Sequence, residues 1–125
     1  MSDEQIEQEI QANGLTAPRV TPADIEANIS SEHYFTAREG VLGELSSDGV
    51  LATVYERANA APAVLGLLTF CVLVLRNGFT VTGESACASP ENFDAEIGRK
   101  IARQKAVDKI WPLMGYALKD RLQCA

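Results

Sequence analysis

Basic side chains gather in the C-terminal third of this 125-residue sequence. Cations repeated along a helix can bind an anionic ligand such as a phosphate. An arginine side chain can donate two parallel hydrogen bonds to a phosphate group. The same spacing also suits a solvated helix face with pairs such as Glu96 and Lys100, four residues apart. The residues in question are Arg99, Lys100, Arg103, Lys105, Lys109, Lys119 and Arg121.

Residues suited to catalysis are sparse. His33 is the only histidine, and the acids Glu84, Glu91, Asp94 and Glu96 show no recognisable acid–base pairing pattern. The sequence contains neither a nucleophile elbow nor a phosphate-binding Walker loop. We therefore predict a protein that is not an enzyme.

The cysteines suggest no metal or disulfide framework. Cys71, Cys87 and Cys124 form an odd set without CxxC spacing, and only His33 could join them as a metal ligand. Buried, reduced thiols are the simplest interpretation, although Cys71 and Cys87 could face each other across a hairpin. No metal and no cofactor is expected.

Charge and length restrict the function classes. The net charge is −6, with 11 acids and 3 bases in residues 1–60 against 6 acids and 8 bases in residues 61–125. This balance argues against a duplex-DNA binder, which needs uncompensated cations for the phosphates. The longest apolar run, APAVLGLLTFCVLVL, is too short and too interrupted to span a bilayer, so a cytosolic protein without membrane contact is expected.

The first 65 residues predict short elements. Residues 1–20 form an acidic tail or a weak helix, with Ser2 and Gln5 in a capping pattern, and residues 21–125 form one domain. Thr21 before Pro22 predicts a helix over 22–30, and alternation predicts a strand over 32–37. Residues of about 40–65 are expected to be a long variable loop, with one helical turn around 50–58.

A β-hairpin is expected over about 67–88. The β-branched and aromatic run LLTFCVLVL is separated from the alternating run FTVTGESACA by Asn77 and Gly78. Asn-Gly between two such runs indicates a type I′ turn, in which both central residues have positive φ.

Two helices should follow the hairpin, one over about 90–110 and a C-terminal one over about 112–122. Ser89, Asn92 or Asp94 can cap the first helix, and Pro112 should end it. On the first helix Ile97, Ile101, Ala102 and Ala106 fall on one side, and Val107, Ile110 and Trp111 on another. Two apolar sides on a short chain predict a homo-oligomer, a dimer or larger. The predicted fold is α+β, with a small antiparallel sheet packed against these helices.

Residues 67–122 resemble the phage gene-49/gene-66 family of small proteins from tailed phages and prophages, and residues 20–40 resemble it more weakly. The matching pattern is Leu-x-Asn-Gly-Phe-x-Val-x-Gly-Glu-Ser, then Asn-Phe-Asp, then Gly-x-x-x-Ala, then Ile-Trp-Pro-Leu-x-Gly-Tyr. In this sequence it falls on Leu75, Asn77, Gly78, Phe79, Val81, Gly83, Glu84, Ser85, Asn92, Phe93, Asp94, Gly98, Ala102, Ile110, Trp111, Pro112, Leu113, Gly115 and Tyr116.

The size and expected fold are also similar to those of the first type of Thoeris anti-defence proteins, phage sponges that bind a cyclic nucleotide-like immune signal. That resemblance implies a phage protein that sequesters such a signal in the host cytoplasm without degrading it, in pockets shared between subunits. An aromatic side chain would stack on a base, an acid would accept hydrogen bonds, and arginines would bind phosphate. The implied ligand-binding residues are Arg38, Phe93, Asp94, Arg99, Arg103 and Arg121.

A second function remains open. The acidic N-terminal half could act as a decoy surface, so that the protein inhibits a host factor by direct contact. A binding protein of this kind would not carry a nucleotide.

Overall fold

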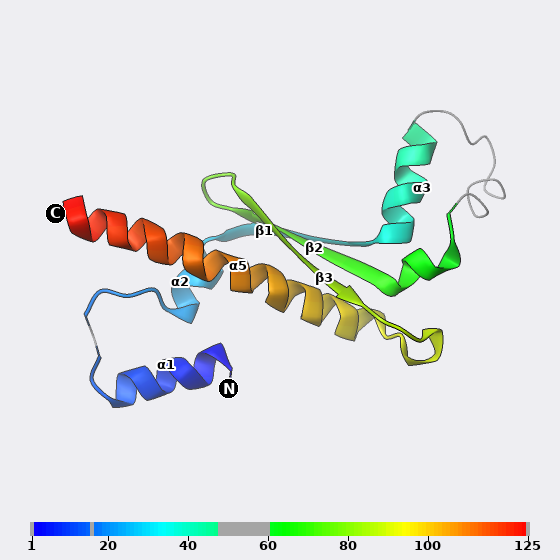
Figure 1. Cartoon of the computed structure of the whole chain (residues 1–125). Coiled ribbons are helices and arrows are strands. Elements are labelled where there is room, and N and C mark those ends of the chain that lie inside the picture. Colours follow the sequence, from blue (N-terminus) through cyan, green and yellow to red (C-terminus); the bar gives the residue numbers. More distant parts are fainter. Residues whose placement is uncertain (1, 16, 48–60, 125) are drawn as a thin grey trace.

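The chain forms an antiparallel sheet with a long helix lying across one face (Figure 1). The structure, a computed structural model, describes residues 2–15, 17–47 and 61–124. Within these ranges the predicted α+β class is confirmed. In chain order the elements are α1 (Asp3–Ala12), α2 (Pro22–Ala27), β1 (Ile29–Thr36), α3 (Ala37–Ser47), the short 3-10 helix η1 (Ala63–Leu67), β2 (Leu68–Leu75), β3 (Thr80–Ala86), the 3-10 helix η2 (Pro90–Asn92) and α5 (Ala95–Cys124).

The sheet has the order β1-β2-β3, with both pairings antiparallel. Side chains of the central strand β2 alternate between buried and half-buried positions, which follows from the two-residue period of a strand. The fully buried set, including Cys71 and Leu73, faces α5, while the alternate set, including Phe70, points to the other face. Strands β2 and β3 form the hairpin that the sequence predicts.

The hairpin turn differs from the predicted type I′ turn. Gly78 has φ +88°, but no described residue other than glycine has a positive φ, so the prediction for Asn77 is wrong. The Gly78 amide donates to the Leu75 carbonyl at 2.9 Å, and the Leu75 amide donates to the Phe79 carbonyl at 2.8 Å. This is a three-residue loop in which a turn is followed by a left-handed glycine. Asn77 contributes through its side chain, whose Oδ1 accepts from the Phe79 amide.

The two helices predicted after the hairpin are one continuous helix, α5. Asp94 caps it, because its Oδ1 accepts from the amides of Glu96 at 2.9 Å and Ile97 at 3.1 Å. Pro112 lies inside α5 and removes one backbone hydrogen bond. Packing continues on both sides of it, since Ile110 is fully buried and Met114 packs against the same core. The prediction that the helix ends at Pro112 is therefore wrong.

The apolar faces of α5 are also divided differently from the prediction. Ala102 and Ala106 are buried together with Val107 and Ile110 on the sheet side. Ile97 and Ile101, predicted to share a face with the two alanines, are 55% and 43% exposed. Small residues form the sheet-facing side because the helix backbone approaches β3 closely at Gly83.

The N-terminal segments follow their capping signals. Ser2 and Gln5 form a capping box on α1, and Thr21 and Asp24 form one on α2, with Pro22 at the first helical position. Strand β1 begins earlier than predicted, at Ile29. Residues 40–47 belong to α3 rather than to a loop, and the helical turn predicted around 50–58 lies outside the described residues.

The contact at Gly83 gives a test of this packing. A Cβ atom added there would lie 2.1 Å from the Ala102 carbonyl oxygen and 2.4 Å from the Ala106 nitrogen, both on the α5 backbone. Because a helix backbone cannot yield as a flexible side chain can, we expect Gly83→Ala to lower the free energy of unfolding by about 3 kcal/mol. Urea denaturation measures the change.

Gly115 supplies the matched control, since it lies in α5 with nothing within 4 Å of an added Cβ. Gly115→Ala should raise the free energy of unfolding by up to about 1 kcal/mol, because alanine favours a helix. Equal stability of the two variants would contradict the close packing of α5 on β3.

Candidate ligand site

A groove of about 490 Å³ lies where the C-terminal half of α5 passes α2 and the hairpin turn. Three arginines from distant parts of the sequence line it, although the chain as a whole has a net charge of −6. Its other polar residues are one acid and one amide, and the remaining lining is apolar. The lining residues are Arg19, Val20, Asp24, Ala27, Asn28, Arg76, Met114, Ala117, Leu118 and Arg121.

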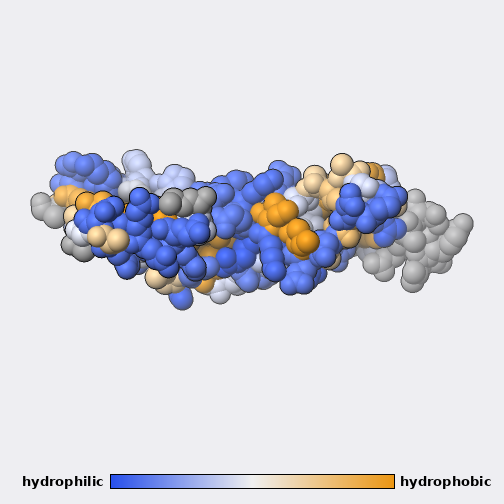
Figure 2. Space-filling model, turned by 90° about the horizontal axis from the view of Figure 1, so that it is seen from below, coloured by the Kyte–Doolittle hydropathy of each residue, from blue (hydrophilic) through white to orange (hydrophobic). Residues whose placement is uncertain are grey.

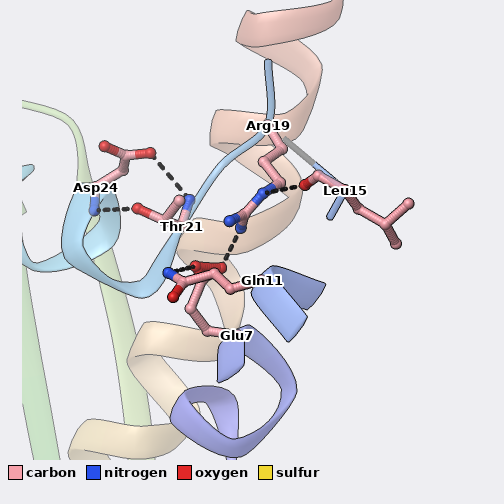
Figure 3. Close-up of polar contacts among 6 residues, drawn as sticks. All are labelled: Glu7, Gln11, Leu15, Arg19, Thr21 and Asp24. Carbon is pink, nitrogen blue, oxygen red and sulfur yellow. Dashed lines mark hydrogen bonds and ion pairs between the residues drawn. The ribbon is translucent and has the colours of Figure 1, made fainter. Parts of the chain in front are cut away.

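Arg19 is held by the segment between α1 and α2 (Figure 3). Its Nε donates to the Leu15 carbonyl at 3.2 Å, and its Nη1 pairs with the Glu7 carboxylate of α1. That ion pair lowers the pKa of Glu7 and raises the pKa of Arg19. Hydrogen bonds from Thr21 lower the pKa of Asp24, so the acid in the groove is charged at neutral pH.

Arg76 enters the groove from the hairpin loop. Its Nε donates to the Ala27 carbonyl at 2.6 Å, and its backbone amide donates to the Asn28 carbonyl at 3.0 Å. These bonds satisfy carbonyl groups at the end of α2, where a cation is favoured by the helix dipole. They also fix the hairpin loop beside α2.

Arg121 lines the groove from the last turns of α5 and is exposed. Among the described residues its side chain has no ion pair or hydrogen bond partner. The groove thus combines two arginines that are positioned by hydrogen bonds with one whose guanidinium is available. The Arg19 charge is matched by Glu7, so Arg76 and Arg121 are the cations that the groove offers to a ligand. Guanidinium groups that line one cavity are suited to bind a phosphate or carboxylate.

Phe93 and Asp94, predicted to bind ligand, lie in another pocket, at the opposite end of α5. This pocket has a volume of about 150 Å³. The Asp94 carboxylate caps the first amides of α5, so these amides are already occupied. The residues around them are mainly apolar or small: Leu67, Ser85, Ala86, Cys87, Asn92, Ile97, Gly98 and Ile101.

Arg103, also predicted to bind ligand, is engaged within the fold. Its Nη1 and Nη2 donate to the Glu26 carboxylate of α2, and its Nε donates to Glu32 of β1 at 2.7 Å. These hydrogen bonds raise its pKa further above the usual value for arginine. The side chain is 30% exposed and joins α5 to two other elements. Its charge is matched inside the molecule.

The last two predicted residues lie elsewhere. The Cζ atom of Arg99 is 5.9 Å from the centroid of the Tyr34 ring, above the sheet. Arg38 lies in the first turn of α3, beyond the end of β1, whereas Asn28 in the groove precedes the start of β1. Of the six predicted residues, the groove contains Arg121.

Distance along α5 explains this separation. Positions 94 and 121 are 27 residues apart, which corresponds to about 40 Å at 1.5 Å per residue. Phe93 and Arg121 of one chain therefore cannot contact the same small molecule. The sequence reasoning also missed Arg19 and Arg76, which stand beside a helix cap and in a hairpin loop and carry no spacing that links them to Arg121.

Comparison with known proteins identifies the family. A model of the phage protein (N4 Gp49/phage Sf6 gene 66) family matches residues 20–122. The chain belongs to this phage protein family. No curated protein and no solved structure matches the chain, so the comparisons give no support for the likeness to Thoeris anti-defence proteins. The family match begins just before α2 and ends within α5; of the three groove arginines it includes Arg76 and Arg121 but not Arg19.

Two further observations concern the chemistry available in this family member. Within the described ranges no group of three or more His, Cys, Asp and Glu side chains could hold a metal ion, and no helix has an apolar stretch long enough to cross a membrane. Cys71 is fully buried, and its burial raises the pKa of the thiol; Tyr34 opposite it also has a raised pKa. Cys71 is thus a protonated core residue.

The bonds of Arg103 predict a structural effect rather than a loss of ligand binding. Arg103→Ala removes the bonds to Glu26 and Glu32 and leaves two carboxylates without their cation. We expect the free energy of unfolding to fall by about 1–2 kcal/mol, since the pair is partly exposed to solvent. Arg99→Ala is the control and should cost less than about 0.5 kcal/mol. Equal effects of the two substitutions in urea denaturation would contradict the tie between α5, α2 and β1.

Proposed function

We propose that this phage-encoded protein captures a small nucleotide-derived signal in the host cytoplasm and releases it unchanged. The observation that carries the proposal is the groove lined by Arg76 and Arg121, together with the Glu7-paired Arg19, in a chain whose net charge is −6. Its volume of about 490 Å³ falls in the range of small-molecule sites. The nucleotide class of the ligand is taken from the sequence resemblance to Thoeris anti-defence proteins, for which the comparisons give no support.

The lining favours binding over turnover. Asp24 is the only acid in the groove, and its carboxylate accepts a hydrogen bond from the Thr21 amide. The lining includes no histidine, cysteine or hydroxyl side chain that could act as a nucleophile or general base. Arginines stay protonated at all relevant pH values, so they can bind a phosphate but cannot take a proton from water.

A complete nucleotide site needs a second copy of the chain. The groove offers cations and aliphatic side chains but no aromatic ring for a base. Phe93, half-buried beside Asp94, could supply the ring, but it lies at the other end of α5. Two chains whose α5 helices run antiparallel would place Phe93 of one near Arg121 of the other. We therefore propose a homo-oligomer with sites shared between subunits.

Inhibition of a host protein by direct contact is the second candidate. The observation in its favour is α1, which carries the acids Asp3, Glu4, Glu7 and Glu9 and no base. Only Asp3 and Glu7 have described contacts with more distant parts of the chain, through Trp111 and Arg19. The exposed acids could imitate a nucleic acid or an acidic protein segment.

Ligand binding is tested by thermal unfolding and calorimetry with cyclic di- and trinucleotides, cyclic ADP-ribose isomers and ADP-ribose. A bound ligand should stabilise the protein by about 2.7 kcal/mol at a hundredfold excess over the dissociation constant. Arg121→Ala should remove this stabilisation without changing the stability of the free protein, because the side chain has no described partner. Lys119→Ala, on the same helix but outside the groove lining, is the matched control.

Phe93→Ala should weaken binding by about 1–3 kcal/mol if the ring stacks on a base. Chromatography of the ligand after heat release should recover it intact. No binding across the panel, with no nucleotide released from the purified protein, would reject this proposal and favour the protein-contact function.

A further inference from the structure

Strand β3 lies at one edge of the three-stranded sheet. Among the described residues its only neighbour in the sheet is β2. The Leu75 amide bonds to the Phe79 carbonyl, and the Cys87 amide bonds to the Leu67 carbonyl. Because hydrogen-bonded pairs alternate along an antiparallel ladder, the backbone groups of residues 79, 81, 83, 85 and 87 face β2. The amides and carbonyls of Thr80, Thr82 and Glu84 therefore face outward.

This edge lacks the usual obstacles to pairing. Strand β3 contains no proline and no recorded bulge, whereas the opposite edge strand, β1, has an irregularity between Ile29 and Ser31. Thr80, Thr82 and Glu84 have their side chains on the sheet face away from α5, alternating with the buried Val81, Gly83 and Ser85. In antiparallel self-pairing about Thr82, threonine would lie opposite threonine, and Glu84 opposite Thr80 rather than another acid.

Exposed apolar residues flank both ends of the edge. Near the start of β3, Phe79 is 56% exposed and Leu113 of α5 is 40% exposed, and both line a mainly apolar groove of about 430 Å³. Near the end of β3, Ile97 and Ile101 of α5 are 55% and 43% exposed. Seen from below, the surface is largely hydrophilic, with an apolar patch near the middle at the level of α5 (Figure 2).

Charges at the two ends are complementary. Residues 87–98, around the start of α5, contain three acids, Glu91, Asp94 and Glu96, and no base. The groove at the other end includes Lys109, and no acid lines it. Lys105 lies between the two ends, beside Gly83, where its long side chain can extend its ammonium group into water.

We propose that the outward edge of β3 pairs antiparallel with β3 of a second copy of the chain. This arrangement would place Ile97 and Ile101 of each copy against the groove of Phe79 and Leu113 on the other. It would also bring the acidic start of one α5 toward Lys109 of the second copy. The same surface is used by both copies, as a twofold dimer requires.

The pairing would determine how the proposed nucleotide site is completed. Gly83 lies beside Lys105, so a twofold axis near the middle of β3 would also pass near residue 105 of both α5 helices. The two helices would then run antiparallel, and the start of one would lie beside about residue 117 of the other. Phe93 and Asp94 of one copy and Arg121 of the other would then lie at the same end of the dimer. This consequence rests on the proposed function, but the β3 interface itself does not.

Thr82→Pro is the sharpest test, because it removes an outward amide and leaves the bonds to β2 in place. Thr82→Val, which keeps both the amide and the β-branched shape, is the matched control. Light scattering after size-exclusion chromatography should give twice the chain mass of 13.5 kDa for the native protein and for Thr82→Val, and 13.5 kDa for Thr82→Pro. A native monomer at 100 μM, or a dimeric Thr82→Pro protein, would overturn the proposal.

A second measurement covers the case in which Thr82→Pro fails to fold. In the native protein the amides of Thr80, Thr82 and Glu84 should exchange with deuterium several-fold more slowly at 500 μM than at 5 μM, up to the limit of about tenfold that a monomer–dimer equilibrium allows over this range. The amides of Val81 and Gly83, which face β2, should be protected at both concentrations. Protection of the outward amides that does not depend on concentration, or rapid exchange at both, would reject the interface.

The interface and the ligand can fail separately. A dimer that depends on Thr82 but binds no nucleotide would support the β3 interface and reject the proposed function. Nucleotide binding by a monomeric Thr82→Pro protein with native affinity would support the β3 interface, reject the site shared between subunits and leave the groove of one chain as the site.

Discussion

The close contact between the α5 backbone and β3 at Gly83 is the constraint on which the rest of the structure depends. There is no room for a side chain at this point, since an added Cβ would overlap the backbone at Ala102 and Ala106. The facing positions of α5 are small for the same reason, and Gly98 similarly approaches the Thr69 side chain. A helix that lies this close to a sheet excludes water from the core between them, and its direction across the strands is fixed.

The direction and length of α5 then determine where chemistry can occur. The helix begins at the Asp94 cap near the end of β3 and continues past Pro112 to the groove beside α2 and the hairpin loop. Arg103 secures its middle by bonding to Glu26 and Glu32. The two ends of one helix therefore carry different potential ligand groups, an aromatic residue with an acid at one end and an arginine at the other. Only an arrangement of more than one chain can combine them.

Because α5 covers only one face of the sheet, backbone groups of β3 and several large apolar side chains remain exposed. Helix α5 covers one face of the sheet and contacts β3 and β2, while β3 stays at the edge with outward backbone groups. Ile97 and Ile101, predicted from the sequence to lie on one of the two apolar sides of the helix, remain exposed beside that edge. In a chain of this size, small residues and a few aliphatic side chains are enough to fill the core. Larger apolar residues therefore remain on the surface, where they can contact another molecule.

The sequence by itself determined the local elements, because their signals act over a few residues. The caps at Ser2 and Thr21, the hairpin over about 67–88 and the α+β class all follow from side chains close to the backbone groups that they order. The residue pattern between Leu75 and Tyr116 also predicted the family, which the family model confirms. Only the tertiary structure decided that α5 continues through Pro112, since burial of Ile110 and packing of Met114 outweigh one lost hydrogen bond. It also decided the candidate site, because Arg19, Arg76 and Arg121 line one groove only through the packing of α2, the hairpin and α5, and no local spacing in the sequence encodes that packing.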